Sequence, residues 1–124
     1  MLNKILTQVL KLKESGSPAE VVSFTNEKMK ESFDIDIEEL YKIISSRGLA
    51  FLKKEKNFTN ENLNILADIF FELAEKIFDD INSHHQSLEL YSQSLNIYEF
   101  IEKDDRTYSI DRNVKITKIK DILD

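Results

Sequence analysis

Residues 59–81 read TNENLNILADIFFELAEKIFDDI, and they predict the strongest helix of the chain. Thr59 is a good helix N-cap, and Phe58 before it can pack on Leu63 as a hydrophobic staple. At about 100° per residue the apolar side chains form one wide arc: Leu63, Leu66, Ala67, Phe70, Phe71, Ala74, Ile77, Phe78 and Ile81, extended by Ile65, Ile69 and Leu73. A helix with so wide an apolar arc is expected to contact neighbours on more than one side, as the central helix of a bundle does.

The same helix carries an acidic stripe almost opposite the centre of its apolar arc. It consists of Glu61, Asp68, Glu72, Glu75 and Asp79. Like charges three or four residues apart cost on the order of 0.2 to 0.5 kcal/mol per pair unless cations cover them. The simpler interpretation is a solvated face, and the alternative is a partner-binding surface for a basic region of the same chain, of a second copy or of another protein. A metal site is not expected, because carboxylates in a line along a helix do not converge on one point.

The next residues, 82–87, read NSHHQS and contain the only two histidines of the chain. Ser83 and Gln86 have the spacing of a capping box, which predicts a turn and a new helix beginning at His84. Adjacent side chains at the start of a helix diverge, so His84 and His85 are not expected to chelate one ion. We therefore interpret NSHHQS as a corner between two helices and not as a metal or catalytic site.

The chain after this corner predicts the second half of a helical hairpin. Its expected inner face contains Leu88, Tyr91, Leu95, Tyr98 and Ile101, with Ser87 and Ser94 beside them as small residues that permit close approach. A closing helix is predicted in residues 107–124, capped by Ser109. Its apolar residues are Ile110, Val114, Ile116, Ile119, Ile122 and Leu123, and its cations Arg112, Lys115, Lys118 and Lys120 could face the acidic stripe.

Residues 1–58 predict shorter helices. The first is expected at 2–14, and the second at 18–33, where Ser17, Pro18 and Glu20 form a capping box with proline at the first helical position. That second helix should bury Val22, Met29 and Phe33. A third is expected at 37–47 with Asp36 as its cap, whereas the apolar run at 49–54 leaves open whether residues 49–56 are helical.

The composition agrees with one all-α domain of five or six helices over residues 1–124. Two glycines and one proline in 124 residues leave few turns for strands, and the absence of cysteine excludes disulfides and thiolate sites. The net charge is −6, and residues 59–102 hold nine acids against one lysine, a net charge of −8. Nucleic acid and anionic membranes are therefore not expected partners. Since the N-terminus lacks the pattern of a signal peptide and no apolar run is long enough to span a membrane, we expect a cytoplasmic protein.

The hairpin at 59–103 resembles a tetratricopeptide repeat (TPR). Leu63, Leu66, Ala67 and Phe70 match the large and small positions of the first helix of that family, and Ser87, Tyr91, Ser94 and Leu95 match those of the second. The first helix is about two turns longer than in a standard 34-residue repeat, and the usual closing proline is missing. Residues 107–112, leading into Lys115 and Ile116, resemble the closing helix of small bacterial TPR-like proteins of unknown function. The resemblance implies antiparallel hairpins stacked in a right-handed superhelix and supplies no catalytic residues.

Three classes of function remain open from the sequence. The preferred one is a non-enzymatic interaction or scaffolding module without a cofactor, which binds a protein or peptide, with a homodimer as an open alternative. The second is a small ligand-binding bundle or enzyme with a polar cavity, for which the candidate groups are Glu102, Tyr41, Tyr91 and Tyr98. The third is an accessory domain of a transcriptional regulator, although no basic recognition helix is evident.

Overall fold

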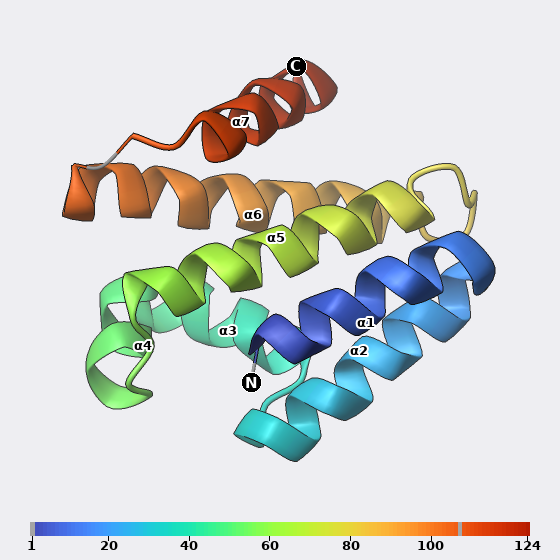
Figure 1. Cartoon of the computed structure of the whole chain (residues 1–124), viewed down its shortest axis with the longest axis horizontal. Helices are drawn as coiled ribbons and strands as arrows, with labels where there is room; N and C mark the ends of the chain where they lie inside the picture. The colour runs from blue at the N-terminus through green and yellow to red at the C-terminus, as the bar shows by residue number, and fades with distance from the viewer. Residues whose placement is uncertain (1, 107) are drawn as a thin grey trace.

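The structure is a computed structural model that describes residues 2–106 and 108–124. Within these residues the chain forms helices and no strand, so the predicted all-α class is confirmed (Figure 1). The seven helices are α1 (Leu2–Ser15), α2 (Pro18–Phe33), α3 (Ile37–Arg47), α4 (Leu49–Glu55), α5 (Asn60–Ile77), α6 (His84–Asp105) and α7 (Ile110–Leu123). The prediction of five or six is one short because residues 49–55, which the sequence left open, are helical. None of these helices is long and apolar enough to cross a membrane.

Helices α5 and α6 form the central hairpin, and α5 lies between α6 on one side and α1 on the other (Figure 1). The seam between α5 and α6 is held by two serine hydroxyls: Ser87 donates to the carbonyl oxygen of Ala74 at 2.7 Å, and Ser94 to that of Ala67 at 2.8 Å. Both serines are fully buried. The predicted close approach at these positions is therefore confirmed.

Helices α1 and α2 pack on the opposite side of α5. The predicted capping box at the start of α2 is present, with both Ser17 and Glu20 making their reciprocal bonds. On the inner face of α2, however, Val21 is fully buried while Val22 and Phe33 are only half-buried. The prediction that α2 buries Val22 and Phe33 therefore holds only in part, because both side chains pack against the core without being fully buried.

The predicted end of α5 and the predicted cap of α6 are also corrected. Helix α5 ends at Ile77 and a turn follows, closed by the amide of Asp80 on the carbonyl oxygen of Ile77 at 3.1 Å, so Ile81 leaves the apolar arc and is 90 % exposed. Helix α6 begins at His84 as predicted, but the hydroxyl of Ser83 makes no capping bond. Ser83 has φ −119° and ψ 4°, which is not the extended conformation that points a capping oxygen at the first turn.

Helix α7 closes the fold by running back along α6 (Figure 1). It buries Ile116 and Ile119, but Ile110 and Val114, which the sequence assigned to the same apolar set, are 72 % and 60 % exposed. The third buried residue of the helix is Arg112. Around the wheel Ile110 and Val114 lie opposite Ile116 and Ile119, so one helix cannot bury both pairs against the same neighbour.

Candidate functional site

The middle of the acidic stripe is covered by lysines of this chain. Lys13 of α1 contacts Glu72 at 2.6 Å and Glu75 at 2.5 Å. From the other side, Lys115 of α7 contacts Asp68 at 3.1 Å, and Lys118 of α7 pairs with Glu75. Glu75 thus links α1 and α7 through one carboxylate.

These contacts shift the pKa values of Glu75, Lys13 and Lys115. Burial alone would raise the pKa of Glu75, but the hydrogen bonds and charges of Lys118 and Lys13 outweigh it and hold that pKa below its ordinary value. Burial likewise opposes the charged form of Lys13 and Lys115, yet their carboxylate partners raise both lysine pKa values. Glu75, Lys13 and Lys115 are therefore ionised near neutral pH, and their ion pairs hold α1 and α7 onto α5.

The two ends of the stripe differ from its middle. Glu61 and Asp79 are exposed, and Asp79 lies in the turn after α5. The structure therefore brings Asp68, Glu72 and Glu75 together with cations and leaves Glu61 and Asp79 apart from that cluster. Of the four cations of α7, Lys115 and Lys118 face the stripe as predicted, whereas Lys120 lies 3.7 Å from Glu99 of α6.

Arg112 is the fourth cation, and it is the buried charge that sequence reasoning missed. Its side chain is 7 % exposed, its Nε and Nη2 both donate to Glu102 Oε2 at 2.9 and 2.6 Å, and its Nη1 donates to Asn64 Oδ1 at 3.2 Å. The spacing of Arg112 to Ile116 and Ile119 was the available signal, since four and then three residues is the period of one helix face. Glu102, a candidate for an enzyme site, is thus engaged in fixing α7 to α6.

The three candidate tyrosines make contacts within the packed helices of the fold. The hydroxyl of Tyr98 donates to Asp68, and burial, followed by the charge of Asp68, raises the Tyr98 pKa. The ring of Tyr91 makes edge contacts with Phe71 and Phe78, with centroids 5.7 and 6.2 Å apart. Tyr41 packs its ring against Phe70. None of the three lines a pocket found on the described surface.

The two histidines point to different partners. His84 Nδ1 lies 2.8 Å from the carbonyl oxygen of Phe78, so this nitrogen carries the proton and donates it, while the ring contacts Phe78 edge-on. His85 is exposed and its Nε2 lies 3.2 Å from Glu89 Oε1. Across residues 2–106 and 108–124 no group of three or more His, Asp or Glu side chains is arranged to hold a metal ion.

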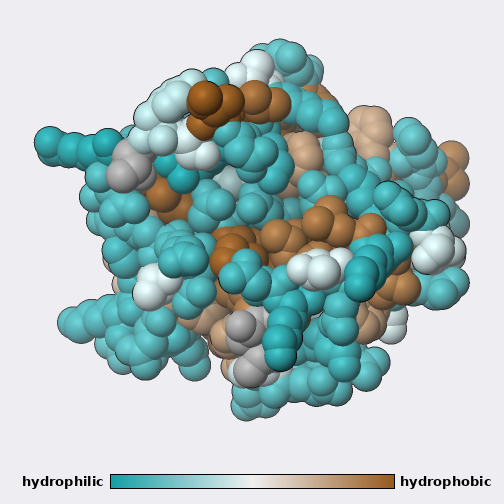
Figure 2. Space-filling view, in the orientation of Figure 1, coloured by the Kyte–Doolittle hydropathy of each residue, from teal (hydrophilic) through white to brown (hydrophobic). Residues whose placement is uncertain are grey.

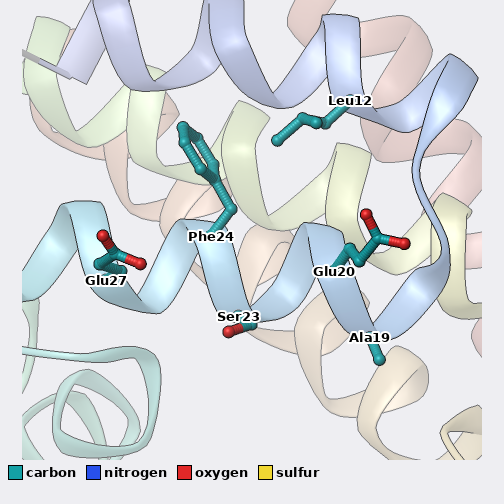
Figure 3. A pocket seen from close by; sticks show the side chains of 6 residues that line it. All are labelled: Leu12, Ala19, Glu20, Ser23, Phe24 and Glu27. Carbon is teal, nitrogen blue, oxygen red and sulfur yellow. The ribbon is translucent and has the colours of Figure 1, made fainter.

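An open surface hollow lies between α1 and α2. This α1–α2 groove has a volume of about 510 Å³ and is lined by Leu12, Ala19, Glu20, Ser23, Phe24 and Glu27 (Figure 3). Leu12 and Phe24 are half-buried and point into the space between the two helices, whereas Glu20 and Glu27 are exposed. The amine of Lys28 lies 5.6 Å from the centre of the Phe24 ring. The groove therefore combines an apolar floor with carboxylates within one helical turn on either side of Phe24.

Comparisons of the chain with protein-family models, with curated proteins and with solved structures found no match. The likeness of α5 and α6 to a tetratricopeptide hairpin accordingly stays a resemblance, since an antiparallel helix pair is common to many all-α folds.

Proposed function

We propose that this chain is a non-enzymatic interaction module that binds a protein or peptide in the α1–α2 groove, on a scaffold of tetratricopeptide-like hairpins. The observation that carries the proposal is the half-buried pair Leu12 and Phe24, which offers apolar surface at the floor of an open hollow. Apolar floors with a polar rim are typical of sites that accept one anchoring side chain of a partner.

The charges of the groove indicate the chemistry of the partner. Glu20 and Glu27 are exposed at the rim, and the chain as a whole has a net charge of −6. Lys28 already lies over the face of Phe24, a position in which a cation is attracted by the ring. A partner segment with an apolar side chain beside lysine or arginine would complement the groove: the apolar side chain fits the floor, and the cation fits the carboxylates of the rim.

The acidic stripe is a weaker candidate for the same role. Asp68, Glu72 and Glu75 already have lysine partners within the chain, so a foreign basic surface would have to displace α1 or α7. The enzyme alternative is also weaker. Its candidate Glu102 is paired with Arg112, and the hollow of about 240 Å³ beside this pair is lined by no serine or threonine hydroxyl. No observation favours the regulatory alternative.

A phage-displayed random peptide library, selected on the immobilised full chain, tests the proposal. Selected peptides should carry an apolar residue next to lysine or arginine and should lose about tenfold in affinity for Glu27→Lys, a loss of about 1.4 kcal/mol. Glu55→Lys in α4 is the matched control, because Glu55 is also exposed and the charge change is identical. Equal binding to the wild type, Glu27→Lys and Glu55→Lys would contradict the proposed site.

The apolar floor is tested separately by Phe24→Ala. Because Phe24 is only half-buried, the variant is expected to keep its helical circular dichroism spectrum while peptide affinity falls. Unchanged affinity in a folded Phe24→Ala variant would remove the groove from consideration.

A further inference from the structure

Helix α7 is fastened to the rest of the chain by ion pairs as well as by a small apolar face. Its buried apolar residues are Ile116 and Ile119, while Ile110 and Val114 face the solvent. Figure 2 shows hydrophobic atoms at the top of the molecule, where Figure 1 places α7. Its polar contacts reach Glu102 and Glu99 of α6 and Asp68 and Glu75 of α5. Departure of α7 exposes Ile116 and Ile119 and leaves its carboxylate partners without cations, so the site then requires a replacement with the same apolar face and the same charge pattern.

The residue that turns the chain from α6 back to α7 is in an unfavourable conformation. Arg106 caps α6 with φ 56° and ψ 27°, in the left-handed region. The other described non-glycine residues with positive φ are Asp34 and Asn57, whose short polar side chains tolerate this region. Arg106 has no such side chain, so its backbone is strained in the folded-back arrangement and relaxed in a right-handed helix.

A continuous helix through Arg106 would keep the buried faces of α6 and α7 in one line. At about 100° per residue, Ser94, Tyr98 and Ile101 of α6 fall on the same stripe as Arg112, Ile116 and Ile119 of α7. The residue of the connection that enters this stripe is Tyr108, which is 71 % exposed in the folded-back chain. The connecting residues 106–109 read RTYS and contain neither glycine nor proline, so a continuous helix gives up only the cap of α7, in which the Ser109 hydroxyl accepts from the amide of Arg112 at 3.2 Å.

We propose that α7 exchanges between two copies of this chain. In the exchanged dimer Arg106 is helical, α6 and α7 form one long helix in each copy, and α7 of each copy occupies the surface on α5 and α6 of the other. This inference is independent of the α1–α2 groove, which lies on α1 and α2 and is not covered by α7.

A second copy is the occupant that the geometry favours. The α7 site already binds α7, so the same helix from another chain fits each cation to its carboxylate. Because α7 runs antiparallel to α6 (Figure 1), two extended α6–α7 helices can lie antiparallel about a two-fold axis near Tyr108. Arg112 of one copy would then meet Glu102 of the other, as it meets its own Glu102 at 2.6 Å in the single chain.

Substitution of Arg106 tests the hinge. Glycine adopts left-handed φ without strain and weakens a helix interior, whereas alanine resists left-handed φ and favours the helix. Light scattering over a range of concentrations should show a dimer for the wild type and for Arg106→Ala, and a dimer at least about tenfold weaker for Arg106→Gly. Arg106 is exposed, so both variants are expected to fold. Equal dimer affinity for the two variants, or a concentration-independent monomer for the wild type and Arg106→Ala, would overturn the proposal.

A mixing experiment distinguishes exchange from any other association. In Glu102→Arg and in Arg112→Glu, each chain alone places like charges at the α7 site. In a mixed exchanged dimer one site regains Glu102 with Arg112, and the other holds the reversed pair. Dimers should therefore form on mixing and be absent or weaker in either variant alone. If mixing two folded variants produces no heterodimer by native mass spectrometry, α7 does not exchange.

Discussion

Ser94 Oγ donates a hydrogen bond to the main-chain carbonyl oxygen of Ala67 across 2.8 Å, and both residues are fully buried in the seam between α5 and α6. The same contact recurs seven residues along, where Ser87 Oγ bonds Ala74 at 2.7 Å. A hydroxyl that reaches a backbone carbonyl of the facing helix requires the two helix axes to lie close, because a serine side chain is only two atoms long. These two bonds therefore fix both the spacing and the register of the hairpin.

Substitutions at Ser94 should separate loss of the bond from loss of space. Ser94→Ala removes one hydrogen bond and is expected to lower the free energy of unfolding by about 1 kcal/mol. Ser94→Leu also forces a large side chain into the seam and is expected to cost a further 1 to 3 kcal/mol, roughly. Urea denaturation followed by circular dichroism measures both. A leucine variant as stable as the alanine variant would show that the seam is looser than the 2.8 Å contact indicates.

Two serines with the same sequence pattern should respond differently to alanine. The Ser17 hydroxyl accepts from the amide of Glu20 at 3.2 Å, and the Ser17 amide donates the reciprocal bond to the Glu20 carboxylate, whereas Ser83 makes no side-chain capping bond. Ser17→Ala is expected to cost about 1 kcal/mol, and Ser83→Ala to stay within about 0.5 kcal/mol of the wild type. Thermal unfolding of the two variants side by side checks this. Similar losses in both would mean that Ser83 caps α6 after all.

Two tyrosines should respond oppositely to removal of the hydroxyl. The Tyr41 hydroxyl is buried and has no hydrogen-bond partner among the described residues, so Tyr41→Phe is expected to be neutral or to stabilise the fold by up to about 1 kcal/mol. The Tyr98 hydroxyl donates to Asp68, so Tyr98→Phe leaves a carboxylate with one partner fewer and is expected to destabilise the fold by about 1 to 2 kcal/mol. Chemical denaturation of both variants gives the comparison. Destabilisation of Tyr41→Phe would reveal a partner for that hydroxyl.

Stability should fall at both ends of the pH scale, for reasons that can be assigned. The folded pKa of Glu75 lies below its ordinary value of 4.5, so its contribution is present above pH 4.5 and is lost as the pH falls through the folded pKa. The folded pKa values of Lys13 and Lys115 lie above 10.5, so their contributions are complete below pH 10.5 and are lost as the pH rises through the folded values. Burial also raises the pKa of Tyr98 above its ordinary value of 10.0, so the stability that this neutral group contributes is lost as the pH rises above 10. Urea midpoints measured across pH should therefore be flat between about pH 4.5 and pH 10.

Glu75→Gln isolates the acid limb of that profile. Glu39 and Asp104, whose pKa values their lysine neighbours also lower, titrate equally in the wild type and the variant. The loss of stability below pH 4.5 should be smaller in Glu75→Gln than in the wild type. Parallel acid limbs in the two proteins would show that the Lys13 and Lys118 contacts of Glu75 do not contribute to stability.

The positions of most helices, and the residues at which they begin, could be predicted from the sequence alone. Ser17, Asp36, Thr59 and Ser109 each cap the helix predicted for them. The apolar arc of residues 63–77 is buried as its period predicts. Capping bonds join residues three positions apart, and the helical period compares residues three or four apart, so both can be read from a short stretch without knowledge of the remainder of the chain.

The contacts that each helix face makes are known only from the tertiary structure. Lys13 and Glu72 are 59 positions apart, and Arg112 and Asn64 are 48 apart, so their pairing depends on the docking of whole helices and not on local spacing. The same docking left Ile110 and Val114 exposed, buried Val21 more fully than Val22, and used the middle of the acidic stripe for internal ion pairs. The α1–α2 groove, too, depends on helix packing, because α1 and α2 leave Leu12 and Phe24 only half-buried where they meet. A periodic pattern fixes which side of a helix is apolar, whereas the neighbour that covers it is selected by the packing of all seven helices at once.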